Sequence, residues 1–283
     1  MTTPAHLIIE RDAHFTWFGL GLWDAPAGTL VSDGITVRVF TSPVTERSFV
    51  RFAVPNRSGA FVVPHLPLPD VTSPPVQYVI EVVDTLGRFV SFLMPIVPAD
   101  QWGFVQPGCG AAMTVTSPAG EQTPLPLFSL PARPAPNGAA VVRAKVTDAA
   151  TGGDAAFAVV EVRHNARTLG RGIADERGEV VVIFAYPEPE PPPAWSPPAP
   201  PPRPQRLAEQ QWPLDVAVNY RPGLARTRTA RDQPPLVNLC DVLSQPPAAV
   251  VAGSPGWTAD DTTLRYGEPL VFGGSIGVWV RAN

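Results

Sequence analysis

Apolar and polar residues alternate with a period of two in several short segments. In residues 35–40 (ITVRVF), Ile35, Val37 and Val39 fall on one face, and residues 48–54 (SFVRFAV) alternate in the same way. Because successive side chains of a strand point to opposite faces, this pattern predicts strands with one buried face. Further strands are predicted at residues 7–10, 60–63, 78–83, 89–93, 141–146, 156–162, 178–186, 214–220, 264–266, 270–272 and 276–280.

Clusters of Gly, Pro, Asp and Asn separate these segments and predict turns. They lie at residues 24–28, 55–59, 84–88 and 148–153. A polar link containing Gly170, Gly172 and Asp175 is expected between the strands at 156–162 and 178–186. Only residues 237–244 are predicted to form one or two helical turns. Short strands divided by turn residues favour an all-β fold of antiparallel sandwiches.

Proline is unusually abundant, with 37 residues among 283. Proline breaks helices, so this content also argues against an α-rich fold. The densest run, residues 187–204 (PEPEPPPAWSPPAPPPRP), favours polyproline II. Trp195 in its middle is expected to be buried against this protein or a neighbour. Partner binding, intramolecular packing and a passive linker all remain open for this segment.

The chain is long enough for two domains. We predict an N-terminal β-sandwich at 1–124, a connector at 125–138, and a C-terminal β-sandwich at 139–283 with the proline-rich insertion at 187–204. The pattern GAFVVPHLP followed by YVIEVVD is weakly echoed by GEVVVIFAYP followed by LDVAVNY. The connector is expected to lie against a surface because it carries apolar residues, namely Leu125, Leu127, Phe128 and Leu130.

The formal net charge of −4 gives no reason to expect nucleic acid or an anionic membrane as a partner. Residues 1–17 lack the pattern of a secretory signal, and no apolar run is long enough to span a membrane. We therefore expect a cytoplasmic protein, with Cys109 and Cys240 as reduced thiols. Arginine makes up all but one of the 21 basic residues, which is typical of a GC-rich genome.

No motif predicts catalysis, a cofactor or a metal. Residues 273–277 (GGSIG) match a nucleophile elbow, but no Asp, Glu or His follows, so a hairpin turn is expected. The four histidines show no metal-ligand spacing, and Asp232, Asp260 and Asp261 lack the pattern of a calcium loop. We therefore expect a protein that is not an enzyme.

Surface aromatic and arginine residues are the remaining candidates for function, as contacts with other proteins. Aromatic and arginine side chains are enriched where proteins bind one another. The candidates are Trp17, Phe18, Trp23, Trp195, Tyr220, Arg221, Arg226 and Arg228.

Residues 146–187 also carry a family resemblance. VTDAATGGDAAFAVVEV followed by GRGIADERGEVVVIFAYP resembles the carboxypeptidase regulatory-like, or transthyretin-like, β-sandwich module. That module has a strand, a D-x-x-T-G turn, a strand with A-x-V-x-V, a D-x-x-G turn and an apolar strand. The resemblance implies a sandwich fold. In its namesakes the module is an accessory to an enzyme, and no catalytic domain accompanies it in this sequence.

The whole chain is similar to stand-alone proteins that accompany phage-tail-like contractile injection systems. The segments that carry this resemblance are FVVPHLP, IEVVDTLGRF, PLFSLPARPAPNGAAVVRAKVTDAATG and LRYGEPLVF. It implies a structural subunit of the particle at the baseplate or cap, with other protein subunits as partners and homo-oligomerisation left open. The alternative is a β-sandwich that binds carbohydrate or a cell surface through exposed Trp and Tyr.

Overall fold

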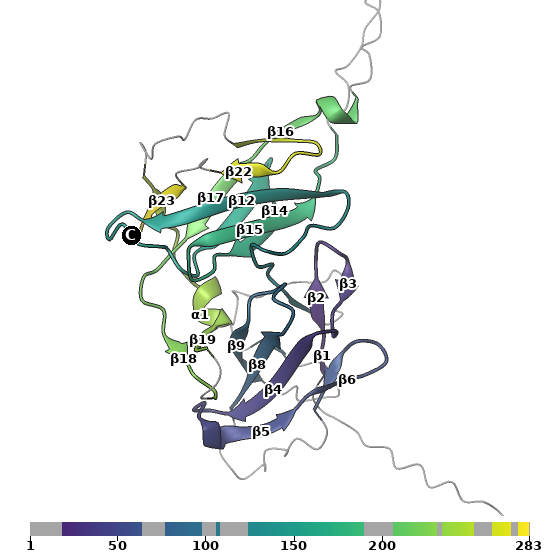
Figure 1. Cartoon of the computed structure of the whole chain (residues 1–283), viewed down its shortest axis with the longest axis vertical. Helices are drawn as coiled ribbons and strands as arrows, with labels where there is room; N and C mark the ends of the chain where they lie inside the picture. Colours follow the sequence, from purple (N-terminus) through teal and green to yellow (C-terminus); the bar gives the residue numbers. More distant parts are fainter. Residues whose placement is uncertain are drawn as a thin grey trace, which may run out of the picture.

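Strands dominate the protein, as the all-β prediction requires. The computed structural model describes residues 19–63, 77–97, 106–107, 124–189, 206–230, 234–251, 262–272 and 277–282. Within these ranges the strands form several sheets, and the one α-helix, α1 (Leu239–Leu243), lies where helical turns were expected. Figure 1 shows the strands in two groups, one built mainly from the N-terminal half and the other from the C-terminal half.

The largest sheet of the N-terminal half has seven strands. Its order is β18-β19-β9-β8-β4-β5, in which β18 (Arg226–Thr227) and β19 (Leu236–Asn238) come from the C-terminal half, and β10 pairs with β9 outside this path. Five strands of this sheet come from the N-terminal half, namely β4 (Ile35–Thr41), β5 (Phe49–Phe52), β8 (Tyr78–Asp84), β9 (Phe92–Val97) and β10 (Gln106–Pro107). The predicted alternation in β4 is confirmed, since Val37 and Val39 are 1% and 0% exposed.

Two three-stranded sheets complete the N-terminal half. One has the order β1-β7-β6 and the other the order β11-β2-β3. Their strands are β1 (Gly19–Leu20), β2 (Leu22–Asp24), β3 (Thr29–Leu30), β6 (Val54–Pro55), β7 (Phe61–Val62) and β11 (Leu125–Pro126); a 3-10 turn, η1 (Glu46–Ser48), precedes β5. Apolar side chains from all these sheets, including Leu22, Phe61, Ile80 and Phe92, form one buried cluster.

The C-terminal half is built on β12 (Ala139–Asp148). One sheet has the order β15-β12-β23-β20 with β22 also beside β12, a second has the order β14-β13-β17, and β16 pairs with β21. The bounds are β13 (Val159–His164), β14 (Arg167–Ile173), β15 (Glu179–Ala185), η3 (Leu207–Glu209), β16 (Gln211–Pro213), β17 (Asp215–Asn219), β20 (Ala249–Val250), β21 (Thr263–Arg265), β22 (Leu270–Phe272) and β23 (Val278–Arg281). A second apolar cluster contains Val142, Val160, Val182 and the fully buried Trp212.

The predicted polar link at Gly170 and Gly172 is wrong, because these residues belong to β14, which pairs antiparallel with β13. A Cβ at Gly172 would lie 2.6 Å from the carbonyl oxygen of Val181 in β15. Glycine therefore lets β14 approach β15 closely, which is a known use of glycine inside strands.

Residues from the C-terminal half also extend the N-terminal sheet. We call residues 224–230 and 234–243 the return segment; it contains β18 (Arg226–Thr227), β19 (Leu236–Asn238) and α1. β19 pairs in parallel with β9, and Leu239 and Val242 of α1 are buried in the N-terminal cluster. The lower group of strands in Figure 1 therefore contains β18, β19 and α1 beside β8 and β9.

The connector lies against the protein, as predicted. β11 pairs in parallel with β2, and Leu125, Leu127 and Phe128 are 3%, 5% and 6% exposed. The core of the N-terminal half therefore includes the connector.

Cys240, at the start of α1, is disulfide-bonded, so the expectation of a reduced thiol is wrong for this residue. The sequence contains one other cysteine, Cys109, which lies outside the described residues.

Candidate functional site

The predicted aromatic contact residues fall into two groups. Trp17, Phe18 and Trp195 lie outside the described residues. Trp23 lies in β2, opposite Leu30 of β3, and is half-buried. It therefore combines a place in a sheet with a partly accessible ring.

Tyr220 is not on the surface, because it is 5% exposed and belongs to the C-terminal cluster. Its hydroxyl donates to Asp148 Oδ2 at 3.5 Å, at the edge of hydrogen-bonding distance. Burial, with a contribution from the charge of Asp148, raises the pKa of Tyr220. Tyr220 therefore contributes to the core and not to a contact surface.

The three predicted arginines do not form one cluster of free cations. Arg226 pairs with Glu176 at 2.8 Å, and its guanidinium carbon lies 4.9 Å from the ring centroid of Phe157. Arg221 is exposed, and its backbone N–H donates to the side chain of Gln245. Arg228 is exposed in the return segment. Arg226 thus helps to fix the return segment to the C-terminal half.

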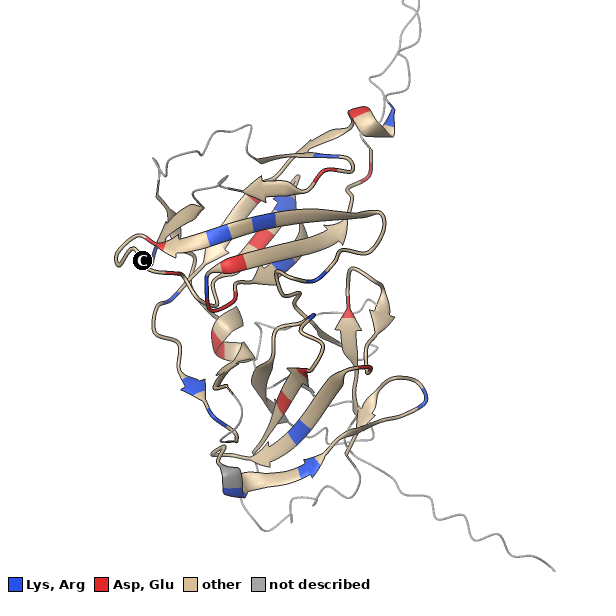
Figure 2. Cartoon of the chain, viewed as in Figure 1, with Lys and Arg blue, Asp and Glu red and all other residues tan. Residues whose placement is uncertain are grey.

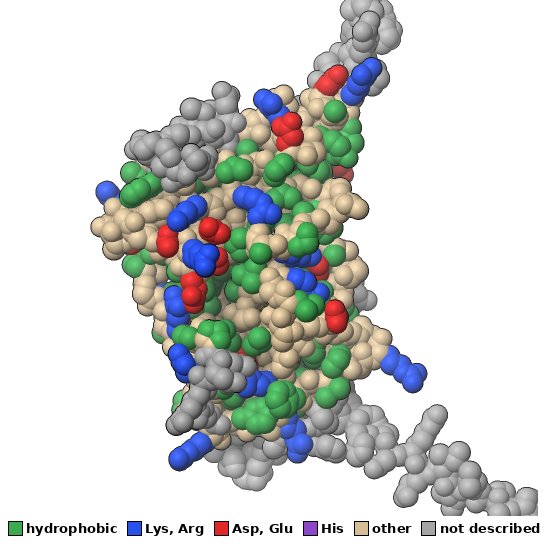
Figure 3. All heavy atoms as spheres, viewed as in Figure 1, with side chains coloured by type: hydrophobic (Ala, Val, Ile, Leu, Met, Phe, Trp, Pro, Cys, Tyr) green, Lys and Arg blue, Asp and Glu red, His purple; other side chains and the backbone are tan. Residues whose placement is uncertain are grey.

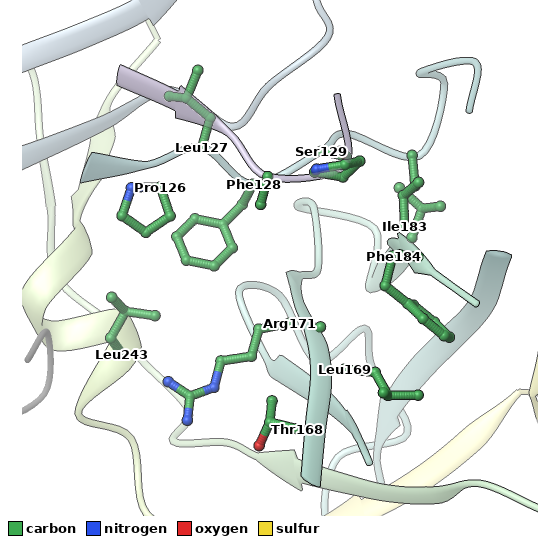
Figure 4. Close-up of a pocket in the computed structure, with 15 residues that line it drawn as sticks. Pro126, Leu127, Phe128, Ser129, Thr168, Leu169, Arg171, Ile183, Phe184 and Leu243 are labelled. Atoms are coloured by element: carbon green, nitrogen blue, oxygen red, sulfur yellow. The ribbon is translucent and has the colours of Figure 1, made fainter. Parts of the chain in front are cut away.

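A cleft of about 380 Å³ lies between the connector, the outer face of β14 and β15, and α1. Its walls are mainly apolar and include Pro126, Phe128, Ile183 and Leu243. Figure 4 shows Phe128 and Leu243 on one side of the space and Arg171 extending into it from β14. This volume lies in the range of small-molecule pockets, so the polar groups in the cleft decide what it can do.

Each polar side chain that lines the cleft already has a partner within the protein. The hydroxyl of Ser129 accepts from Arg133 at 2.8 Å. The Thr168 hydroxyl and Arg171 Nε both donate to Glu161, at 2.8 and 2.7 Å. Among the described residues, the cleft lining therefore contains no free nucleophile and no free general base of the kind that catalysis requires.

Glu161, behind the cleft, is a buried carboxylate held by three side chains. Burial alone would raise the pKa of Glu161, but hydrogen bonds from Thr168 and Arg163 and the charge of Arg171 outweigh it, so the pKa is lowered. The carboxylate thus remains ionised and joins β13 to β14, a structural role. Sequence reasoning missed this group because the cross-strand position of Arg171 follows from the register of β13 and β14.

Each of the other buried carboxylates also has at least one partner, although Asp24 Oδ1 accepts no hydrogen bond from a described residue. Asp24 pairs with Arg133, and Glu81 pairs with Arg38 and accepts from the hydroxyl of Thr229. Asp84 accepts the backbone N–H of Phe89 at 2.9 Å, and Asp148 accepts the backbone N–H of Ala150 at 2.9 Å. Two of these groups join segments that are distant in sequence, and the other two close turns.

Within the described ranges, no group of three or more His, Cys, Asp and Glu residues is arranged to hold a metal ion. His164 Nδ1 lies 2.8 Å from the carbonyl oxygen of Pro213, which fixes the ring in the C-terminal half. In the same ranges, no tryptophan or tyrosine is exposed, so the carbohydrate alternative finds no aromatic platform there.

Three of the exposed apolar side chains among the described residues lie close together in sequence on β5 and β6. Phe49, Phe52 and Val54 are 41%, 55% and 53% exposed. Phe49 packs edge-on against Phe52, with ring centroids 5.1 Å apart, and against the buried Phe40 at 5.8 Å. Figure 3 shows apolar side chains with basic ones around them at the lower end of the molecule, where Figure 1 places β5. We call Phe49, Phe52 and Val54 the β5 surface.

No protein-family model, curated protein or solved structure matches this chain. Among the described residues, no helix combines the length and apolar character needed to cross a membrane.

Proposed function

We propose that this protein is a non-enzymatic structural subunit that acts through contacts with other proteins. The use of its buried carboxylates carries this proposal. Every buried Asp and Glu side chain of the described residues contacts an arginine or closes a turn, and the cleft offers no free reactive group. Active sites require titratable groups that are free to react, whereas scaffolds use such groups to hold strands together.

We also propose that the two halves are β-sandwich modules, the second with a proline-rich arm at 187–204. Two separate apolar clusters support the two modules. Described residues on the two sides of the arm contact each other, since the rings of Tyr186 and Trp212 have centroids 5.4 Å apart and the Trp212 indole N–H donates to the carbonyl of Glu188 at 3.4 Å.

The assembly that we propose is a phage-tail-like contractile injection particle, with this subunit in the baseplate or cap region. The resemblance of four segments of the sequence to proteins that accompany such systems motivates this choice. The exposed β5 surface supports a subunit of an assembly, because contiguous exposed apolar side chains often mark protein contacts.

Deletion of the gene in the source organism tests this proposal. We expect electron microscopy to show tail-like particles that are absent, or that lack density at one end, and complementation with the intact gene to restore them. Normal particles in the deletion strain would contradict the proposal.

A further inference from the structure

We propose that the outer edge of β5 binds an extended, acidic segment of another protein as an additional strand. The bound segment has apolar side chains at alternate positions and carries carboxylates. This inference rests on the proposed function only in assuming a protein partner, and it specifies the surface and the chemistry of that partner.

The edge geometry of β5 leaves backbone groups available. Among the described residues, β5 is the last strand of its sheet and pairs only with β4. The Ala53 N–H donates to the carbonyl of Val37 at 2.9 Å, and Arg51 lies opposite Val39. In an antiparallel pair these bonds alternate along the strand, so the N–H and C=O of Phe52 point away from β4. An added strand can form hydrogen bonds with these two groups.

The side chains of the β5 surface provide the apolar part of the contact. Proteins usually protect an edge strand with charges, proline or a bulge. β5 has a register shift opposite Val39 and Phe40, but it exposes Phe49 and Phe52 instead of hiding them. Exposed aromatic rings at a free edge are a hazard for aggregation unless a partner covers them.

The charge around this edge indicates an acidic partner. Arg47, Arg51 and Arg57 are exposed, and none forms an ion pair with a described residue. Residues 46–63 contain three arginines against one acidic residue, Glu46. Figure 2 shows this basic character on β5 and on the loop after β6. A protein of net charge −4 thus carries a locally basic edge.

The same charges argue against a second copy of this chain as the partner. Pairing two β5 edges would bring six arginines together across one short interface. Like charges at an interface oppose association and disfavour the wrong partner. An acidic strand from a different protein instead neutralises the arginines and covers Phe49 and Phe52.

Selection from a displayed library of random peptides, with the full chain as the target, tests the proposal. Each peptide is about 12 residues long, which is enough to form a strand. We expect the selected peptides to alternate apolar residues and to carry net negative charge. For the tightest of them, made synthetically, fluorescence anisotropy should show binding about 10-fold weaker for Phe52→Ala and for Arg51→Glu. Binding should also weaken as salt rises from about 50 to about 300 mM.

The matched controls are Leu86→Ser and Arg265→Glu, which change an exposed apolar and an exposed basic residue elsewhere. They should alter the affinity by less than about 2-fold, as expected outside an interface core. Circular dichroism checks that all four variants fold, and their changes are at exposed positions.

Three results would overturn the proposal: no selected peptide, peptides without an acidic bias, or equal affinity for Phe52→Ala. A dimer in sedimentation that is lost in Phe52→Ala would assign the edge to a second copy. If the chain is part of the particle but binds no acidic peptide, the proposed strand binding at β5 is wrong and the proposed function stands. If acidic peptides bind β5 but the deletion strain makes normal particles, the proposed place in a contractile particle is wrong and the binding role of β5 stands.

Discussion

Glu161 shows at the residue scale how charged groups are used in this protein. Its side chain is 5% exposed, whereas its partners Arg163 and Arg171 are 46% and 48% exposed. The carboxylate lies at the sheet surface with its charge compensated by arginines that reach solvent, which limits the cost of burying it. It therefore fixes the neighbouring strands β13 and β14 in register.

Replacement of Glu161 by glutamine should lower the free energy of unfolding at neutral pH by about 2 kcal/mol, because the two arginines lose their counter-charge. The pKa of Glu161 is lowered from its ordinary value of 4.5 by folding. Its stabilising effect is therefore complete above that value and is lost as the pH falls through the lower pKa of the folded state.

Urea unfolding of both proteins between pH 7 and pH 3 measures this effect. The difference in unfolding free energy between the wild type and Glu161→Gln should narrow with acid. The exposed Glu268→Gln serves as the control. A difference that stays constant with pH would show that the charge of Glu161 does not stabilise the fold.

At the scale of the element, β14 depends on glycine. A Cβ at Gly170 would lie 3.0 Å from Val182 Cγ1, and one at Gly172 would lie 2.8 Å from Val180 Cγ2 as well as close to the Val181 carbonyl. Side chains at these positions would push β14 away from β15. The two glycines therefore set the spacing between the two strands.

Gly172→Ala should cost about 2 kcal/mol of stability, the usual range for overpacking a tight site. Gly153→Ala is the matched control, since its added Cβ meets only the flexible side chain of Thr151, at 3.3 Å. Gly153→Ala should change the free energy of unfolding by less than about 0.5 kcal/mol. Thermal unfolding measures the stability of both variants, and Gly172→Ala should melt at the lower temperature. Equal melting temperatures for the two variants would contradict the role of Gly172.

The same scale shows what sequence could and could not predict. β4, β8, β12 and β15 follow from periodic apolar residues, because their buried side chains alternate or run continuously. β14 does not, since its glycines have no apolar period and were interpreted as a link. β19 was missed because its partner β9 is distant in the chain, and no local pattern encodes that pairing.

The candidate surface was only half predictable for a similar reason. Residues 48–54 were predicted as a strand, and the structure has β5 and β6 there. The exposure of Phe52 was not predicted, because it depends on β5 being the last strand of its sheet among the described residues. Burial of Tyr220 was also missed, because it depends on tertiary packing.

At the scale of the whole molecule, the return segment joins the two halves. Arg38, Glu81 and Thr229 form a network in which Thr229 of this segment contacts Glu81 of the N-terminal sheet. Phe157 and Ile173 of the C-terminal half also pack in the N-terminal cluster. Chain crossings of this kind favour cooperative unfolding of the two halves.

The disulfide of Cys240 should reinforce this connection. Reduction is expected to lower stability by about 2–5 kcal/mol, the usual effect of losing a native disulfide. Because the cytosol keeps thiols reduced, a particle subunit of the kind proposed should carry this bond only after the particle has left the cell.

Alkylation with and without reductant, followed by peptide mass spectrometry, measures this bond. Cys109 is the expected partner, because it is the only other cysteine in the sequence. In Cys240→Ser, unfolding should no longer depend on reductant. Alkylation of both cysteines in the native, unreduced protein would contradict the prediction.

Co-sedimentation tests the central claim of a structural subunit most directly. A tagged copy of the chain, expressed from its own locus, is followed through density-gradient purification of tail-like particles. We expect the chain to sediment with tube and sheath subunits at a fixed ratio that survives moderate salt. Recovery of the chain only at the top of the gradient, while intact particles sediment without it, would contradict the claim.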